Sequence, residues 1–157
     1  MKRIFRILLS ITFILYLAAV SYLLFFGTRG ISWSGMNLFE YIKTSSNFIP
    51  FKTINFYLSS ILNSSINKSI PLKNLVGNLI LFIPLGIYLP YFLKKLNRVW
   101  AFIIVLILLL FLIELTQVVT RRGSFDIDDF ILNMLGSMLG FGLWKMIFRK
   151  KLTFSHS

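Results

Sequence analysis

The sequence contains no cysteine and a single histidine, the penultimate residue His156. Without cysteine, the chain has no disulfide, no thiolate zinc site, no iron–sulfur ligation and no cysteine nucleophile. A single histidine at this position leaves no inner imidazole for a catalytic dyad or a histidine metal site. These absences weigh against an enzyme, and we assign no catalytic residue.

Charged residues are also scarce. They make up 14% of the 157 residues, where an average soluble domain carries about 25%. Hydrophobic residues make up 57%, and the mean hydropathy is +0.80. The five acidic residues face 17 Lys and Arg, for a net charge of +12. Because the basic residues fall between long apolar runs, their excess indicates membrane topology and not nucleic-acid binding.

Four apolar runs cover most of the chain, at residues 7–26, 75–93, 99–120 and 127–148. Each is close to the roughly 20 residues with which a helix crosses the hydrocarbon core. Inside lipid the backbone must satisfy its own hydrogen bonds, which favours helices. The sequence therefore predicts one all-α domain over residues 1–157, a polytopic membrane helical bundle with four transmembrane helices. We expect the first run to be retained, since it is longer than a secretory signal core and lacks a cleavage site.

Basic residues at the span ends orient the bundle. Ten of them fall on one side, namely Lys2, Arg3, Arg6, Lys94, Lys95, Arg98, Lys145, Arg149, Lys150 and Lys151. The other seven are spread mostly along an external loop, residues 27–74. The positive-inside rule then predicts a multi-pass protein of the cell membrane with both termini in the cytoplasm.

The external loop contains a helical pattern of its own. Phe51, Ile54, Leu58 and Ile61 recur at helical spacing. This pattern predicts a short helix. It either lies in the membrane interface or packs on the spans.

Polar residues interrupt three of the spans at a similar expected depth. At about 1.5 Å per residue, Asn78, Glu114 and Asn133 lie ~9, ~7 and ~9 Å outward of the middle of their helices. Gln117 continues the face of Glu114 one turn further out. Four of the five acidic residues fall between residues 114 and 129. This concentration is the main functional clue in the sequence.

The fourth span gathers polar and small residues on one face. Asp126, Asp129, Asn133, Gly136 and Gly140 fall within about one third of the helix circumference, as does Ser137, whereas Asp128 points away. Small residues four apart allow a neighbouring helix to approach closely. In the second span, Pro84 removes a helical hydrogen bond, which predicts a kink.

Each of these features also has a structural interpretation. Asp126 can cap the fourth helix, with Asp128 and Asp129 beside the helix dipole. Asn78 and Asn133 can form interhelical hydrogen bonds, and Arg121 or Arg122 can pair with the carboxylates. Glu114 fits a purely structural account least well, because a carboxyl group two turns inside a span needs a proton, a cation or a donor.

Three stretches resemble the VanZ-like family of small bacterial membrane proteins: NFIPFKTI (47–54), NLVGNLILFIPLG (74–86) and IELTQVVTRRGSFDIDDFILNMLGSMLG (113–140). The family pattern marks Asn78, Pro84, Gly86, Glu114, Gln117, Arg122, Asp126, Asp129, Asn133, Gly136 and Gly140. The resemblance implies a cell-envelope membrane protein that influences susceptibility to glycopeptides such as teicoplanin. No settled biochemical activity comes with the family.

We expect an outer-leaflet polar pocket that binds an anionic lipid or lipid-linked glycan head group, without a cofactor. Its residues are Asn78, Glu114, Gln117, Arg121, Arg122, Asp126, Asp129 and Asn133. Helix packing and kinking are assigned to Pro84, Gly86, Gly136 and Gly140. Two alternatives stay open. One is a metal-dependent enzyme on a lipid-linked phosphate, with a divalent cation held by Glu114, Asp126 and Asp129. The other is a partner subunit of an envelope complex.

Overall fold

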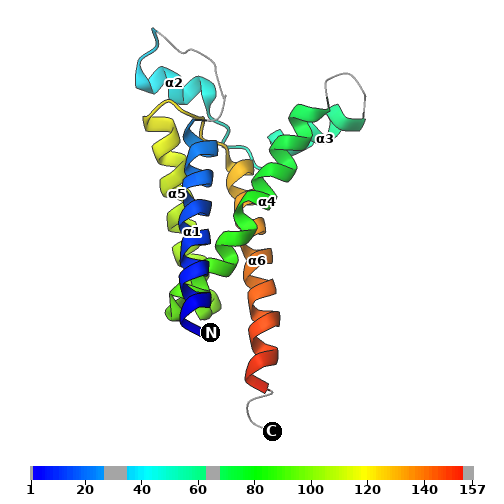
Figure 1. Cartoon of the computed structure of the whole chain (residues 1–157). Coiled ribbons are helices and arrows are strands. Elements are labelled where there is room, and N and C mark those ends of the chain that lie inside the picture. The colour runs from blue at the N-terminus through cyan, green and yellow to red at the C-terminus, as the bar shows by residue number, and fades with distance from the viewer. Residues whose placement is uncertain (1, 27–34, 63–67, 154–157) are drawn as a thin grey trace. The chain divides into compact units, whose positions relative to one another are not determined.

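The computed structural model describes residues 2–26, 35–62 and 68–153. The helices are, in order, α1 (Lys2–Phe25), α2 (Leu38–Ser45), α3 (Lys52–Leu62), α4 (Ser69–Phe92), the 3-10 helix η1 (Lys94–Asn97), α5 (Val99–Val119) and α6 (Ile127–Thr153) (Figure 1). Within the described residues no strand forms, and α1, α4, α5 and α6 are each long and apolar enough to cross a membrane. The predicted all-α architecture with four candidate spans is confirmed.

The chain folds as two compact units. Unit 1 combines Met1–Ser46 with Leu115–Phe125, and unit 2 combines Asn47–Glu114 with Asp126–Ser157. The single domain predicted over residues 1–157 thus contains two separately compact parts, and α5 contributes residues to both.

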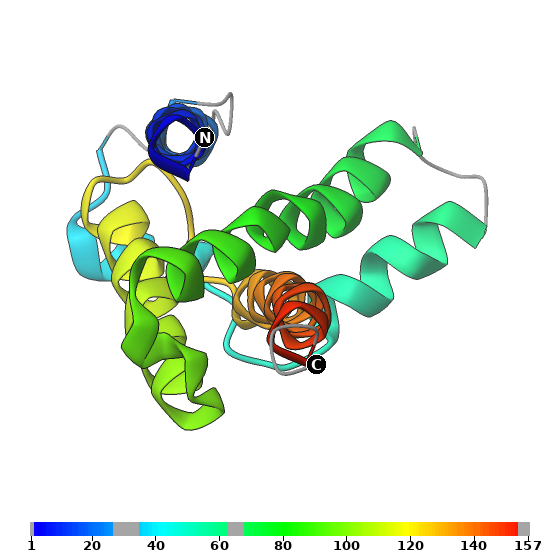
Figure 2. The ribbon, with the colours of Figure 1, turned by 60° about the horizontal axis from the view of Figure 1, so that its bottom comes forward.

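In unit 2, α4 and α6 cross with their backbones in close contact, as Figure 2 shows in a view close to the α6 axis. A side chain at Gly136 would collide with the carbonyl oxygen of Leu79, and one at Gly140 with that of Ile83. A side chain at Gly86 of α4 would collide with the α6 backbone in return. Glycine is therefore required at these three positions, since any Cβ would push the two helices apart.

The helix α4 begins at Ser69, before the predicted start at residue 75, and runs without interruption through Pro84 and Pro90. Pro71 lies in its first turn, where a backbone N–H has no helical acceptor, so proline costs nothing there. The predicted kink at Pro84 stays a prediction.

Aromatic and polar contacts join α6 to the end of α4 and the start of α5. Phe102 of α5 stacks on Phe141 of α6, with ring centroids 4.3 Å apart. One turn further along α6, the Trp144 indole N–H donates to Asn97 Oδ1 over 2.8 Å, and the Trp144 ring meets the Tyr91 ring edge to face. These contacts hold the α4–α5 turn against α6.

The short helix predicted in the external loop is present as α3, which contacts both α4 and α6. A second short helix, α2, was not predicted. It begins with a capping box in which Asn37 Oδ1 accepts from the Glu40 N–H and the Glu40 carboxylate accepts from the Asn37 N–H. The N-x-x-E spacing of residues 37–40 is a sequence signature of such a start.

Candidate functional site

The polar residues of unit 2 form a layer at the start of α6. Glu114 lies twelve residues beyond Phe102 on α5, and Asp129 lies twelve residues before Phe141 on α6, so each acid is about 18 Å along its own helix from the Phe102–Phe141 stack. The Glu114 carboxylate lies against the Asp126 backbone N–H, one turn of α6 from Asp129. Asn78 of α4 joins them, since its amide donates to Asp129 Oδ1. Three helices thus contribute Asn78, Glu114 and Asp129 to one polar layer.

Glu114 and Asn78 are almost completely buried within the protein, at 3% and 5% exposure. The Glu114 carboxylate faces the start of α6, where its Oε2 lies 3.4 Å from the Asp126 backbone N–H. The carboxyl group that had the weakest structural explanation from the sequence therefore lies against the positive end of a helix dipole.

Asn133 lies one turn of α6 from Asp129, and Ser137 lies a further turn along the helix. The depth predicted for Asn133 in the membrane stays a prediction.

The D-I-D segment at the start of α6 binds the start of α3. Asp126 Oδ1 caps α6 by accepting from the Asp128 N–H, which agrees with the structural interpretation of this residue. The Asp126 carboxylate also accepts from the Thr53 hydroxyl over 2.7 Å and from the Asn47 amide over 3.1 Å. A backbone hydrogen bond from the Ile127 N–H to the Asn47 carbonyl completes the contact.

Asp128 supplies the N-terminal cap of α3. Its fully buried carboxylate accepts three backbone N–H groups, from Phe51 over 2.5 Å, from Thr53 over 2.7 Å and from Ile54 over 3.1 Å. Phe51 reaches this position with a left-handed backbone, φ 64°. The sequence pattern places Asp128 away from the polar face and beside the dipole of the fourth helix, but it does not predict that Asp128 caps α3. The family-like stretch 47–54 contains the backbone N–H groups of Phe51, Thr53 and Ile54 that Asp128 binds, and it was the one clue to this contact in the sequence.

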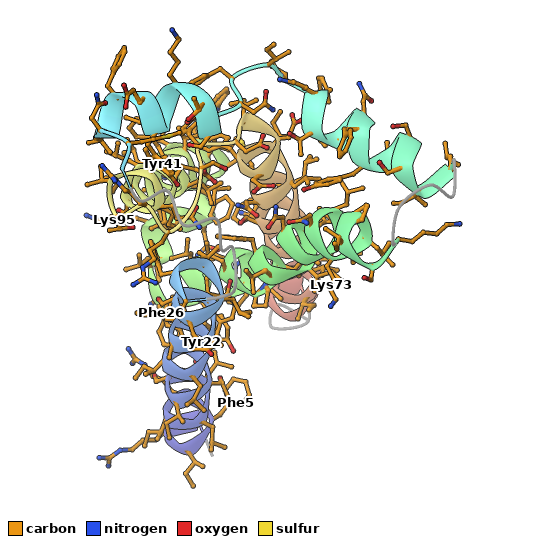
Figure 3. All side chains as sticks on the ribbon, turned by 90° about the horizontal axis from the view of Figure 1, so that it is seen from above. Phe5, Tyr22, Phe26, Tyr41, Lys73 and Lys95 are labelled. Carbon is orange, nitrogen blue, oxygen red and sulfur yellow. The ribbon has the colours of Figure 1, made fainter. Side chains whose placement is uncertain are left out.

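In unit 1, two arginines follow the C-terminal end of α5. The Arg121 guanidinium lies 5.9 Å from the centre of the Tyr41 ring, and that of Arg122 lies 5.7 Å from the centre of the Phe26 ring. Both arginines are exposed, whereas Tyr41 is buried and its hydroxyl donates to the Gly123 carbonyl. Figure 3 shows Phe26 with its stacking partner Tyr22 on α1 and Tyr41 on α2.

Gln117 and Arg121 shape the turn that presents this pair. The Gln117 carbonyl accepts from the Arg122 N–H, and the Val118 carbonyl accepts from the Arg121 N–H, which is the Schellman pattern of a helix end. Arg121 occupies the left-handed position, φ 55°. The Gln117 side chain is 1% exposed and donates to the Leu24 carbonyl near the end of α1. Its amide is therefore occupied within unit 1.

The residues predicted for one pocket thus belong to two units. Unit 2 contains Asn78, Glu114, Asp126, Asp129 and Asn133, and unit 1 contains Gln117, Arg121 and Arg122. Within the described parts of the chain, no three His, Asp or Glu side chains are grouped so that they could hold a metal ion.

The sequence is similar to known proteins over most of its length. The model of a family described as VanZ/LLP1 matches residues 13–149. The protein VanZ of Enterococcus faecium is 30% identical over 131 residues, which cover 83% of this chain and 69% of that protein. No solved structure matches. The family match includes the polar layer, the D-I-D segment and the arginine pair.

Proposed function

The chain belongs to the VanZ/LLP1 family, and from this premise we propose that it is a cell-membrane protein of the bacterial envelope that binds an anionic lipid head group or a lipid-linked glycan phosphate. Its action is binding and not catalysis. Through that binding it influences susceptibility to glycopeptides such as teicoplanin. We place the two termini in the cytoplasm and the arginine pair in the outer leaflet, following the positive-inside rule.

The observation that carries this proposal is the exposed arginine pair of unit 1. Each guanidinium carbon lies over an aromatic ring. A guanidinium held over a ring by a cation–π contact still has five N–H donors, which can bind phosphate oxygens in a bidentate manner. The pair also directly follows a candidate span, and aromatic residues such as Tyr41 and Phe26 are typical of the membrane–water interface. Arginine held in this way favours a lipid phosphate.

Unit 2 supports the proposal through its polar layer. Placing polar or acidic groups inside a membrane-spanning bundle costs free energy. This layer contains three of them, Asn78, Glu114 and Asp129. We propose that this layer, together with Asn133, binds uncharged polar groups of a lipid within unit 2. Gln117 has a second role, since its amide holds the end of α1.

The proposal is tested by native mass spectrometry of the full chain with its co-purified lipids. We expect wild type to retain anionic phospholipid, and the Arg121→Gln/Arg122→Gln variant to retain at least about tenfold less, because a hydrogen bond to a charged group contributes about 1.5–3 kcal/mol. Lys43→Gln is the matched control, since it removes an exposed cation from α2 of the same unit. Equal retention by all three proteins would refute the proposal.

The biological consequence has its own measurement. Expression of wild type should change teicoplanin susceptibility of a sensitive host, and the double arginine variant, present in the membrane in equal amount, should not. Co-purification of a second envelope protein with both forms, with no bound lipid, would instead support the partner-subunit alternative.

A further inference from the structure

Asn133 and Ser137 are buried by the fold, and one side-chain oxygen of each has no hydrogen-bond partner in the part of the chain that the structure describes. Asn133 is 3% exposed and Ser137 0%. Among the described residues, neither Asn133 Oδ1 nor Ser137 Oγ has a hydrogen-bond partner. Nearly all buried polar side-chain atoms in folded proteins are paired, because an unpaired one lowers stability. Two such oxygens in successive turns of α6 indicate a partner from outside the chain.

Asn133 and Ser137 lie on one side of α6. On α6, Gly136 and Gly140 face α4, and Phe141 faces α5. At about 100° per residue, Asn133 and Ser137 fall on the arc between these two faces. We call the space beside this arc the seam; it lies one to two turns of α6 beyond Asp129.

The partner of Asn133 Oδ1 must donate a hydrogen bond, because a carbonyl oxygen only accepts. Asn78 uses one amide N–H on Asp129, and neither of its amide N–H groups is bonded to Asn133 Oδ1. Ser137 Oγ can donate or accept, so a single O–H group can pair with both side chains.

We propose that this seam is a binding site for a hydroxyl group, which donates to Asn133 Oδ1 and shares a hydrogen bond with Ser137 Oγ. Residues four apart on a helix are about 6 Å apart along its axis, close to the sum of two hydrogen bonds of about 2.8 Å. One oxygen between them therefore bridges both side chains. The Phe102–Phe141 stack closes the seam below Ser137, so the hydroxyl group enters from the side of the polar layer.

Two sources supply the same chemistry. An internal water molecule bridges buried polar groups in this way in many proteins. A hydroxyl of a lipid head group does the same, and this source alone rests on the proposed function. A test in which lipid is first absent and then added separates the two.

The experiment measures the melting temperature, Tm, of the full chain carrying Ser137→Ala or Asn133→Leu. Ser10→Ala in α1 is the matched control for the gain in helix propensity, because the Ser10 hydroxyl bonds only a carbonyl of its own helix. Each protein is heated in lipid-free detergent, with phosphatidylglycerol, and with phosphatidic acid. Both lipids carry a phosphate, but only the phosphatidylglycerol head group carries alcohol hydroxyls. The measurements are made at a pH above the second ionisation of phosphatidic acid, so that its phosphate has no P–O–H donor.

Bound water predicts that both variants melt about 2–4 °C lower than wild type in lipid-free detergent, after correction with the control. A head-group hydroxyl predicts that phosphatidylglycerol raises the wild-type Tm more than phosphatidic acid does, and that both variants abolish this difference. The inference is overturned if both variants melt at or above wild type and the two lipids act alike. That outcome leaves anionic lipid retention by the arginine pair intact, so it is distinguishable from failure of the proposed function.

Discussion

Replacing Asp128 with Asn should release the start of α3 from α6. The Asp128 carboxylate accepts three backbone N–H groups in a site with no solvent exposure. The amide of Asn keeps one acceptor oxygen and turns an N–H₂ group toward backbone donors, so up to two of these N–H groups lose their acceptor. An unsatisfied buried group costs about 1–3 kcal/mol, and we expect the variant to lose about 2–4 kcal/mol of stability.

Thermal unfolding in detergent measures the total loss, and hydrogen exchange locates it. We expect the amides of Phe51, Thr53 and Ile54 to exchange much faster in the Asp128→Asn variant, because they are the donors that lose their acceptor. Glu40→Gln is the control, since it changes a carboxylate in an exposed capping box of unit 1. Wild-type stability together with unchanged exchange at these three amides would refute the reasoning.

Three further predictions follow from single contacts. Gly140→Ala should lower Tm by several degrees, because the new Cβ would collide with the Ile83 carbonyl of α4. Gly142→Ala is the control and should melt at or above the wild-type Tm, because its Cβ would meet nothing within 4 Å. Equal effects of the two changes on Tm would contradict the close packing. Arg121→Gly should keep or raise Tm, because glycine relieves a left-handed backbone that costs about 1–2 kcal/mol at Arg121. The same variant should retain less lipid in native mass spectrometry, because it lacks one guanidinium of the pair. A lower Tm would count against the turn geometry. Because the chain has no cysteine, the single substitutions Lys43→Cys and Lys95→Cys report topology directly. A membrane-impermeant maleimide added to intact cells should label the cysteine at position 43 and not the one at position 95. The reverse labelling pattern would show that the predicted orientation is wrong.

Several polar residues have local roles that no sequence pattern predicts. Gln117 was grouped with Glu114 because the two share a helix face, but its amide donates to the Leu24 carbonyl, ninety-three residues away in sequence. Asp128 points away from the polar face of the fourth span and was given only a role beside the helix dipole, but its carboxylate holds the start of α3. Helix periodicity gives the direction of a side chain but not the distant backbone group that it meets.

The sequence alone determined that lipid surrounds the long helices, where these helices lie and which residues are candidates for the site. Long apolar runs with few charges have only one stable form in lipid, and the spacing of small and polar residues on residues 126–140 identifies the packing face without coordinates. Tertiary structure decided which groups share a height and which are paired, because the offset between two helices depends on side-chain contacts such as the Phe102–Phe141 stack. The Asn78–Asp129 hydrogen bond places these two residues in one layer, and Asn133 and Ser137 lie buried one and two turns further along α6. Hydrophobic patterning is a property of each helix by itself, whereas the pairing of polar atoms is a property of the contacts between helices.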